Sequence, residues 1–151
     1  MGDSPFEQLH HICIAVHDID RAVAFYESVG IGPWHDYPPL EEFTDLQVRS
    51  AEGFRALIYR WAMIGDVQLQ LVQPGPADTP QREFLDAHGP GVYHLGFVVA
   101  DADRAERDAA ALGLSATARG RRPDGSGFTY FDTRDGAGVT LEIRQSAVPG
   151  T

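Results

Sequence analysis

Apolar residues change their spacing along the chain, and these changes separate predicted strands from predicted helices. Residues 10–16 and 93–99 are short aliphatic and β-branched runs, which is the pattern of buried strands. In 19–29 and 102–112 the apolar residues recur at helical spacing instead. Each half of the chain therefore begins with a strand and continues into a helix of about three turns.

Residues at both ends of the predicted helices agree with this assignment. Asp18 and Asp101 stand just before the helical stretches, where an aspartate side chain caps free backbone N–H groups. Gly30 and Gly113 stand just after them, where a left-handed residue commonly ends a helix. The same start and stop signals thus occur twice.

The rest of each half is strand-like. Apolar residues alternate with polar ones or form short runs in further segments, which we predict to be strands: 44–50, 54–63, 66–72, 115–119, 127–132 and 138–144. Turns are predicted at Pro123-Asp-Gly125 and Arg134-Asp-Gly136. The proline-rich stretch 74–91 joins the halves, and within it we expect a short helix over 80–87.

The two halves also match residue by residue. The string from His11 to Ala22 reads against the string from His94 to Ala105 at an offset of 83. The ends of the halves, 67–71 and 139–143, match at an offset of 72, so the second half is shorter by 11 residues in its middle. A shared asymmetric pattern of this length indicates an internal duplication.

This duplication predicts an α+β fold made of two βαβββ modules. The length of 151 residues suits one compact domain, so we expect a single domain over 1–151. Module one covers about 8–74, a linker covers 75–91, and module two covers about 92–146.

The repeat places four polar side chains at matching strand positions. His11 and His94 lie on the first strand of each half, and Gln70 and Glu142 lie at one shared position of the last strands. If the last strand lies beside the first, each module offers an imidazole and an oxygen donor to one face. Such a donor set suits one divalent metal ion, which we expect to be Zn, Co, Ni, Mn or Fe.

Other interpretations of these residues stay open. A histidine on an apolar strand is more often a core residue than a ligand, and only the repeat favours ligation here. Gln68 shares a strand face with Gln70, so a shifted register is an alternative, although the spacing from Pro74 favours Gln70. Glu142 would be costly to bury among apolar neighbours without a cation; alternatively it faces solvent.

Composition narrows the classes of function and partner. The formal net charge of −10 argues against a nucleic-acid partner. Cys13 is the only cysteine, so no disulfide within the chain is available and a reducing, cytoplasmic location is expected. Residues 1–8 lack the apolar core of a secretory signal, and no apolar run approaches the length of a membrane span.

Four strings carry a family resemblance: HHICIAVHDIDRAVAFYESVGI, DVQLQLVQP, YHLGFVV and GVTLEI. They resemble the glyoxalase, bleomycin-resistance and extradiol-dioxygenase superfamily, also called vicinal oxygen chelate proteins, over about residues 8–145. The closest similarity is to methylmalonyl-CoA epimerase-like proteins. The resemblance implies an open-barrel-like curved sheet around a metal held by His11, Gln70, His94 and Glu142.

One residue that the resemblance implies has no clear counterpart. The epimerases have a second catalytic glutamate on a middle strand of module one, and that position falls near Ala56. Glu52 is close in sequence but is not expected on the same strand face. This departure weakens the epimerase assignment in particular and leaves the four ligands intact.

The leading hypothesis is a metal-dependent isomerase, epimerase or glyoxalase-type lyase acting through an enediolate on a small carbonyl or acyl-CoA substrate. Glu142 is the candidate catalytic residue that moves the proton. An extradiol-type dioxygenase is an alternative, because two histidines and a carboxylate also bind iron in oxygenases. A non-enzymatic drug-binding resistance protein is a third hypothesis. Gln70 as a fourth ligand argues against the dioxygenase, and retention of all four ligand types argues against the binder.

Aromatic residues concentrate in module one. Trp34, Tyr59 and Trp61 are candidates for the wall of a pocket around a small-molecule substrate, or alternatively for core packing. The surplus of aromatic residues also predicts a homodimer that buries them. The arginines within 119–122 are expected in a solvated loop; alternatively they anchor an anionic tail of the substrate.

We predict that alanine substitutions of two adjacent histidines differ in their effect on metal content. His11 lies on the predicted ligand side of its strand, and strand alternation turns His10 to the other side. His11→Ala should remove the ion and lower the Tm, since a ligand bound only by the folded state stabilises it, whereas His10→Ala should keep the ion. Elemental analysis and thermal unfolding measure both effects. The reverse pattern would show that the strand register is shifted by one residue.

Overall fold

The computed structural model describes residues 4–147, which form two compact units. The N-terminal unit consists of two segments: 11–40 and 49–93. The C-terminal unit consists, within the described residues, of three segments: 4–10, 41–48 and 94–147. Both units combine strands with helices, which confirms the predicted α+β class. Within residues 4–147, no helix has the length and apolar character needed to cross a membrane.

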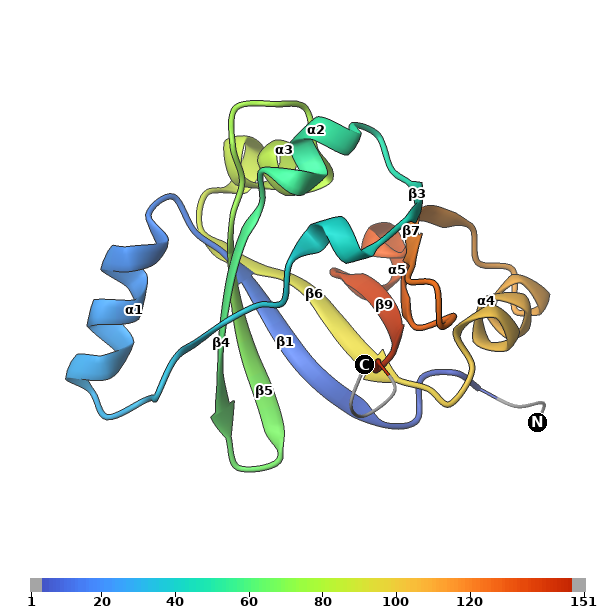
Figure 1. Cartoon of the computed structure of the whole chain (residues 1–151), viewed down its shortest axis with the longest axis horizontal. Helices are drawn as coiled ribbons and strands as arrows, with labels where there is room; N and C mark the ends of the chain where they lie inside the picture. The colour runs from blue at the N-terminus through green and yellow to red at the C-terminus, as the bar shows by residue number, and fades with distance from the viewer. Residues whose placement is uncertain (1–3, 148–151) are drawn as a thin grey trace. The chain divides into compact units, whose positions relative to one another are not determined.

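The N-terminal unit holds a sheet in the order β2-β4-β5-β1. Its elements are β1 (Leu9–Ala15, whose first two residues belong to the other unit), α1 (Ile19–Ser28), β2 (His35–Asp36), α2 (Ala51–Arg55), β4 (Ile58–Ile64), β5 (Val67–Gln73) and α3 (Pro80–His88). A short 3-10 helix, Leu40–Glu42, begins at the last residue of the segment 11–40 and continues into the segment 41–48. β1 and β5 run parallel, whereas β4 pairs antiparallel with both β5 and β2. The three long strands β4, β5 and β1 can be followed side by side in Figure 1.

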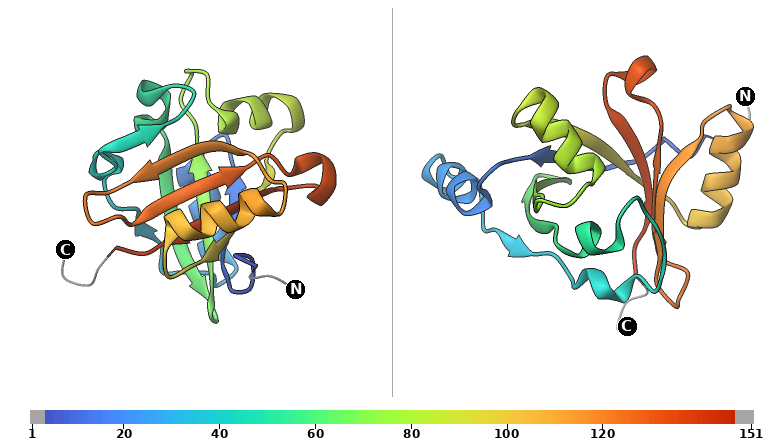
Figure 2. Two further views of the ribbon diagram at one scale, coloured as in Figure 1. Left: turned by 90° about the vertical axis from the view of Figure 1, so that its right-hand side faces the viewer. Right: turned by 90° about the horizontal axis from the view of Figure 1, so that it is seen from above.

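The C-terminal unit holds a second run of strands in the order β6-β9-β8-β7-β3. Its elements are β3 (Asp45–Gln47), β6 (Gly91–Val98, whose first three residues belong to the other unit), α4 (Ala102–Ala111), β7 (Ala116–Arg121), β8 (Gly127–Phe131), α5 (Arg134–Ala137) and β9 (Thr140–Gln145). β6 and β9 run parallel, and the other neighbours run antiparallel. In the left view of Figure 2, α4 (yellow-orange) lies over the orange and red strands of this unit.

Apolar side chains pack α1 on the sheet of the N-terminal unit and α4 on the strands of the C-terminal unit. In the N-terminal unit, Ile19 and Val23 of α1 form a buried cluster with Leu71 of β5. In the C-terminal unit, three alanines of α4 pack on Phe131 and Ile143. The small alanines let α4 approach the sheet closely, so the helical pattern in the sequence translates directly into core contacts.

The predicted helices and their caps are confirmed. Asp18 and Asp101 each accept a hydrogen bond at 3.1 Å from the backbone N–H three residues further on. Gly30 and Gly113 follow α1 and α4 with φ of +86° and +93°, a conformation that a glycine adopts without strain. The short helix expected over 80–87 is α3.

The middle of module one differs from the prediction. Residues 51–55 form α2, which includes the first two residues of the strand predicted over 54–63. The Ser50 hydroxyl accepts a hydrogen bond from the N–H of Gly53 at 2.9 Å and caps this helical turn. The strand predicted over 54–63 begins only at Ile58. The strand predicted over 44–50 is reduced to β3, which pairs with β7 of the C-terminal unit.

The turn predicted at Arg134-Asp-Gly136 also differs from the prediction. These residues belong to the one-turn helix α5, and Gly138 rather than Gly136 takes the left-handed conformation, with φ of +76°. The turn predicted at Pro123-Asp-Gly125 is confirmed, with Gly125 at φ of +88° and its N–H donating to the carbonyl of Arg122.

One polar contact occurs in both units. Gln73 Oε1 accepts a hydrogen bond from the N–H of Ile19 at 2.8 Å, and Gln145 Oε1 accepts one from the N–H of Ala102 at 3.0 Å. Each bond joins the end of the last strand to the first residue of the helix and satisfies an N–H that has no partner within the helix. The two glutamines match at the offset of 72, so the repeat in the sequence contained a signal for them.

We predict that Gln73→Ala and Gln145→Ala each lower the free energy of unfolding by about 1–2 kcal/mol, because a partly buried N–H loses its acceptor. The control is Gln47→Ala at an exposed position of β3, which should change it by less than about 0.5 kcal/mol. Urea unfolding of the three variants provides the measurement. If the control lost as much stability as the other two, the helix contacts would not be the cause.

Candidate functional site

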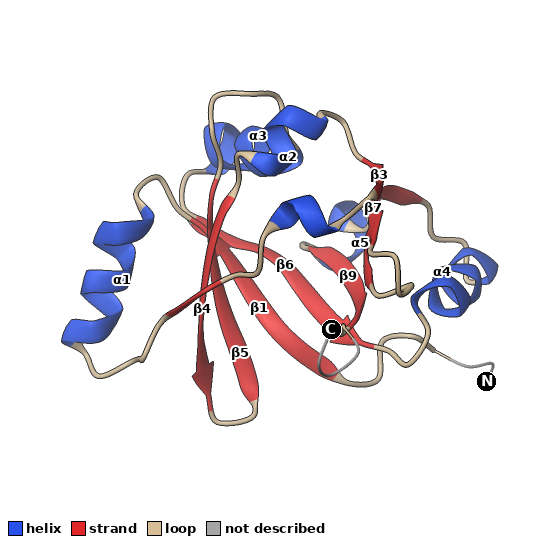
Figure 3. Ribbon diagram, in the orientation of Figure 1, coloured by secondary structure: helices blue, strands red, loops and turns tan. Residues whose placement is uncertain are grey.

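In each unit one face of the sheet is covered by a helix, α1 in the N-terminal unit and α4 in the C-terminal unit. We call the opposite face of each sheet the ligand face. Leu71 packs toward α1, so strand alternation turns its neighbour Gln70 to the ligand face of the N-terminal unit. Ile143 packs toward α4, so Glu142 turns to the ligand face of the C-terminal unit. Figure 3 shows α1 and α4 in blue and the strands in red.

In the C-terminal unit, His94 and Glu142 are in contact. His94 is 0% exposed and Glu142 is 4% exposed. His94 Nε2 and Glu142 Oε2 are 3.1 Å apart. The parallel register pairs His94 with Thr140, so Glu142 lies two residues further along β9 on the same face. The predicted pairing of first and last strand is therefore confirmed in this unit.

In the N-terminal unit, His11 and Gln70 have the same strand relation. His11 is 1% exposed and Gln70 is 3% exposed. The parallel register pairs His11 with Gln68, just as His94 pairs with Thr140. Gln70 Nε2 donates a hydrogen bond to Gln68 Oε1 at 2.6 Å. Both predicted ligand pairs thus occupy equivalent places on the ligand faces of their own units.

The donor atoms of His94 and Glu142 fit a divalent ion. Two ligands that lie about 2.1 Å from one ion at tetrahedral or octahedral angles are about 3.0–3.4 Å from each other. The 3.1 Å separation of His94 Nε2 and Glu142 Oε2 falls in this range. A buried carboxylate also needs a cation or strong hydrogen-bond donors, which an imidazole and a metal ion both supply.

Aromatic side chains extend the ligand face of the C-terminal unit, and the sequence reasoning missed two of them, Tyr130 and Phe128. Tyr130 pairs with Glu142 across β8 and β9, and its ring centroid is 5.1 Å from that of His94. Phe128 is 5.1 Å from Tyr130, and Phe43 is 5.1 Å from Phe128. Strand alternation within the predicted strand 127–132 contained a signal for Tyr130 and Phe128.

The structure separates the three aromatic residues predicted to line a pocket. Trp61 pairs with Gln70, and Tyr59 lies two residues away from Trp61 on the same ligand face. Trp34 instead packs on the α1 cluster, with its ring 5.4 Å from that of Tyr26. Trp34 therefore lies on the helix-covered face, in agreement with the alternative of core packing.

The position predicted for a second catalytic glutamate is not on a strand. Ala56 is the C-cap of α2, and Glu52 lies in the first turn of the same helix with an exposed side chain. The expectation that Ala56 belongs to a middle strand was wrong, because its N–H donates to the carbonyl of Glu52 at 3.0 Å and closes the last turn of α2.

The arginines within 119–122 do not form a solvated loop, which corrects that prediction. Arg119 and Arg121 belong to β7 and point toward α4, where both contact Asp103 and Glu106. Arg121 is only 4% exposed. The carboxylates of α4 compensate the charge of these two arginines, so their role within this unit is structural.

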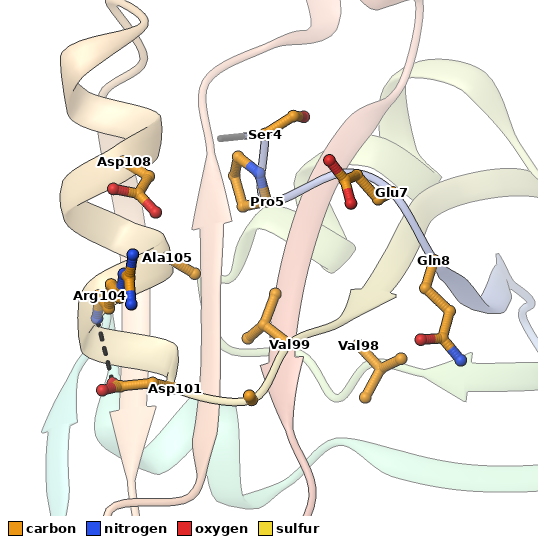
Figure 4. Close-up of a pocket in the computed structure, with 11 residues that line it drawn as sticks. Ser4, Pro5, Glu7, Gln8, Val98, Val99, Asp101, Arg104, Ala105 and Asp108 are labelled. Atoms are coloured by element: carbon orange, nitrogen blue, oxygen red, sulfur yellow. Dashed lines mark hydrogen bonds between the residues drawn. The ribbon is translucent and has the colours of Figure 1, made fainter. Parts of the chain in front are cut away.

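A pocket of about 340 Å³ opens elsewhere in the C-terminal unit. It lies between the segment 4–8 and the start of α4, with Glu7, Arg104 and Asp108 among its polar lining residues (Figure 4). Neither His94 nor Glu142 lines it. This pocket is therefore distinct from the ligand face.

A family model described as the Glyoxalase/Bleomycin resistance protein/Dioxygenase superfamily matches residues 10–131. The matched residues include His11, Gln70 and His94 and end before Glu142. A curated relative, the uncharacterized protein YqjC of Bacillus subtilis (strain 168), is 35% identical over 92 residues, or 60% of this chain. The match spans 56% of the length of that relative.

Solved structures are similar over almost the whole chain. Methylmalonyl-CoA epimerase from Mycobacterium tuberculosis is 23% identical, with 98% of this chain and 93% of that chain covered and a TM-score of 0.74; at this identity the likeness concerns the fold alone. A variant of Streptomyces coelicolor methylmalonyl-CoA epimerase in complex with 2-nitronate-propionyl-CoA is 27% identical, with 95% and 99% covered and a TM-score of 0.74.

We predict that the contact between Arg121 and Asp103 makes stability depend on pH. The hydrogen bond from the Arg121 guanidinium holds the pKa of Asp103 below its usual range. Because the folded-state pKa is the lower one, the stability that Asp103 contributes is present above about pH 4 and is lost as the pH falls through the folded-state pKa. The excess stability of the wild type over Asp103→Asn should therefore shrink on acidification in urea unfolding, and a constant excess would contradict a charge effect. Asp108→Asn on the same helix is the control.

Proposed function

Because the chain belongs to the glyoxalase, bleomycin resistance protein and dioxygenase superfamily, we propose that it is a metal-dependent enzyme that moves a proton next to the carbonyl of an acyl-CoA or other small carbonyl substrate. The reaction class is isomerisation or epimerisation, and the reaction of a glyoxalase-type lyase is a closely related variant. The observation that carries the proposal is the buried pair of His94 and Glu142 together with the equivalent pair of His11 and Gln70.

In this proposal, His11, Gln70, His94 and Glu142 hold one divalent ion. The histidines supply imidazole nitrogens, and Gln70 and Glu142 supply oxygens. When bound, the ion supplies positive charge beside the oxygens of the substrate. With one carboxylate among four donors, the site keeps a net positive charge for the oxyanion that develops when a proton leaves the neighbouring carbon.

Glu142 is the residue that we propose to take and return the proton. It is the one carboxylate among the four proposed ligands, and its position beside His94 and Tyr130 shields it from water. Epimerisation through two opposed groups needs a second acid or base. The position expected for it, Ala56, has no ionisable side chain, and Glu52 is exposed on α2 instead of lying on a strand. These features favour an isomerisation, in which Glu142 takes the proton from one carbon and returns it to a neighbouring atom on the same face of the enediolate. An epimerisation would need the proton to return from the opposite face, through a donor other than Glu142.

The ligand faces and the relatives support the proposed substrate class. Trp61 and Tyr59 in one unit, and Tyr130 and Phe128 in the other, offer aromatic surfaces that exclude water from a reacting carbon. The similar Streptomyces coelicolor epimerase was solved with a propionyl-CoA derivative, which supports an acyl-CoA as the first substrate to test. A homodimer in the cytoplasm remains the prediction for the assembly and its location.

We predict that Glu142→Gln lowers the rate of proton exchange by about 10²–10⁴-fold while much of the metal stays bound, because an amide keeps an oxygen donor but takes no proton at neutral pH. The measurement is deuterium incorporation from D₂O into methylmalonyl-CoA, followed by mass spectrometry, with the metal content determined in parallel. Glu52→Gln is the matched variant and should retain exchange.

Two outcomes would redirect the proposal. Exchange that persists in Glu142→Gln but disappears in Glu52→Gln would move the base to Glu52. A metal-loaded wild type that exchanges no proton in acyl-CoA or hemithioacetal substrates, yet consumes oxygen with iron and a catechol, would make the chain a dioxygenase instead.

A further inference from the structure

Two glutamines lie side by side on the ligand face of β5. Gln70 is buried, whereas Gln68 is half-buried. Gln70 Nε2 donates to Gln68 Oε1 at 2.6 Å. The strand register places Gln68 opposite His11, so Gln68 is adjacent to both proposed ligands of this unit. Their shared strand face raised the question of which glutamine is the ligand; Gln70 is the more buried of the two, and its amide donates to Gln68.

In the structure, the Gln70 amide turns its NH₂ toward the carbonyl oxygen of Gln68. An amide has a donor end and an acceptor end of almost the same size, and only the oxygen end binds a cation. The carbonyl oxygen of Gln68 accepts the NH₂ of Gln70 but would repel its carbonyl oxygen. The contact therefore holds the NH₂ toward Gln68, and Gln70 Oε1 takes no part in it.

The second half of the chain explains why an orienting partner is needed only in the first. Glu142 matches Gln70, and its two carboxylate oxygens are chemically equivalent, so a rotated carboxylate still presents an oxygen. Thr140 matches Gln68 and lies opposite His94, as Gln68 lies opposite His11. Gln68, with its long side chain and acceptor oxygen, thus occurs in the first half. There the ligand Gln70 could bind wrongly, with its NH₂ in place of its oxygen toward the metal.

We propose that Gln68 is a positioning residue, which is not itself a ligand but keeps the oxygen of Gln70 directed to the metal. This inference rests on the proposed function, since it assumes that Gln70 binds the ion. Neighbours that orient a metal ligand commonly change metal affinity by about 10–100-fold when they are removed. Gln68 should therefore affect metal affinity through the amide of Gln70.

The test is a double-mutant cycle on the full chain with Co²⁺ as the probe. The dissociation constant is measured by competition with a chelator, and the visible absorption spectrum of bound Co²⁺ reports the ligand geometry. Gln68→Met should weaken Co²⁺ binding by about 10–100-fold when residue 70 is the native glutamine. In the Gln70→Glu background the same substitution should change binding by less than about threefold, because a carboxylate needs no orientation.

Controls separate positioning from folding. Gln68→Glu keeps an acceptor for the Gln70 NH₂ and should retain tight Co²⁺ binding. Gln68→Thr copies the second half and should weaken binding as Gln68→Met does, which preserves the test if Gln68→Met does not fold. Thermal unfolding without metal shows which variants are folded.

Each remaining outcome has a distinct meaning. An equal loss of affinity in both backgrounds would indicate a packing role, and no loss with native Gln70 would refute any role; either result overturns the inference. If Gln70→Ala weakens binding and Gln68→Met does not, the inference fails while the proposed function stands. If the wild type binds no Co²⁺, the proposed function fails, and the inference fails with it.

Discussion

The parallel pairing of the first and last strand in each unit is the constraint on which the rest of the structure depends. It sets His11 opposite Gln68 and His94 opposite Thr140, with the proposed oxygen ligand two residues further along. A slip of one residue in either last strand would turn the proposed oxygen ligand of that strand toward the helix-covered face. The last strands also contribute Gln73 and Gln145, which bond to the first residues of α1 and α4. A single register therefore supports both the core packing and the candidate site.

The features that could be predicted from the sequence are those that depend on local signals repeated in both halves. The aspartate caps, the glycine ends and the ligand positions were each recognised twice, so one copy supported the other. The structure of residues 41–57 has no such support, because this is the region in which the two halves differ in length. There the Ser50 cap produces α2 where apolar spacing indicated a strand, and the partner of β3 lies about 70 residues further along the chain.

Side chains whose placement depends on distant partners could not be assigned from periodicity. Trp34 follows α1 in a segment without regular spacing, and its contact with the α1 cluster comes from the fold. Arg121 is a charged residue of a kind common in loops, but it lies buried in β7, because Asp103 on α4 compensates its charge. Tyr130 lies in a correctly predicted strand, yet its position next to His94 requires the order of β6, β9 and β8.

The pairing of β3 with β7 has a consequence for the independence of the duplicated halves. Residues 45–47 come from the first half of the sequence, but they form the outermost strand of the C-terminal unit and satisfy backbone groups of β7. A fragment containing only residues 92–147 would expose that row of N–H and C=O groups as an open edge, which is a template for pairing with other chains. The first half therefore protects the second against aggregation, and a single ancestral copy would have required another segment to cover the same edge.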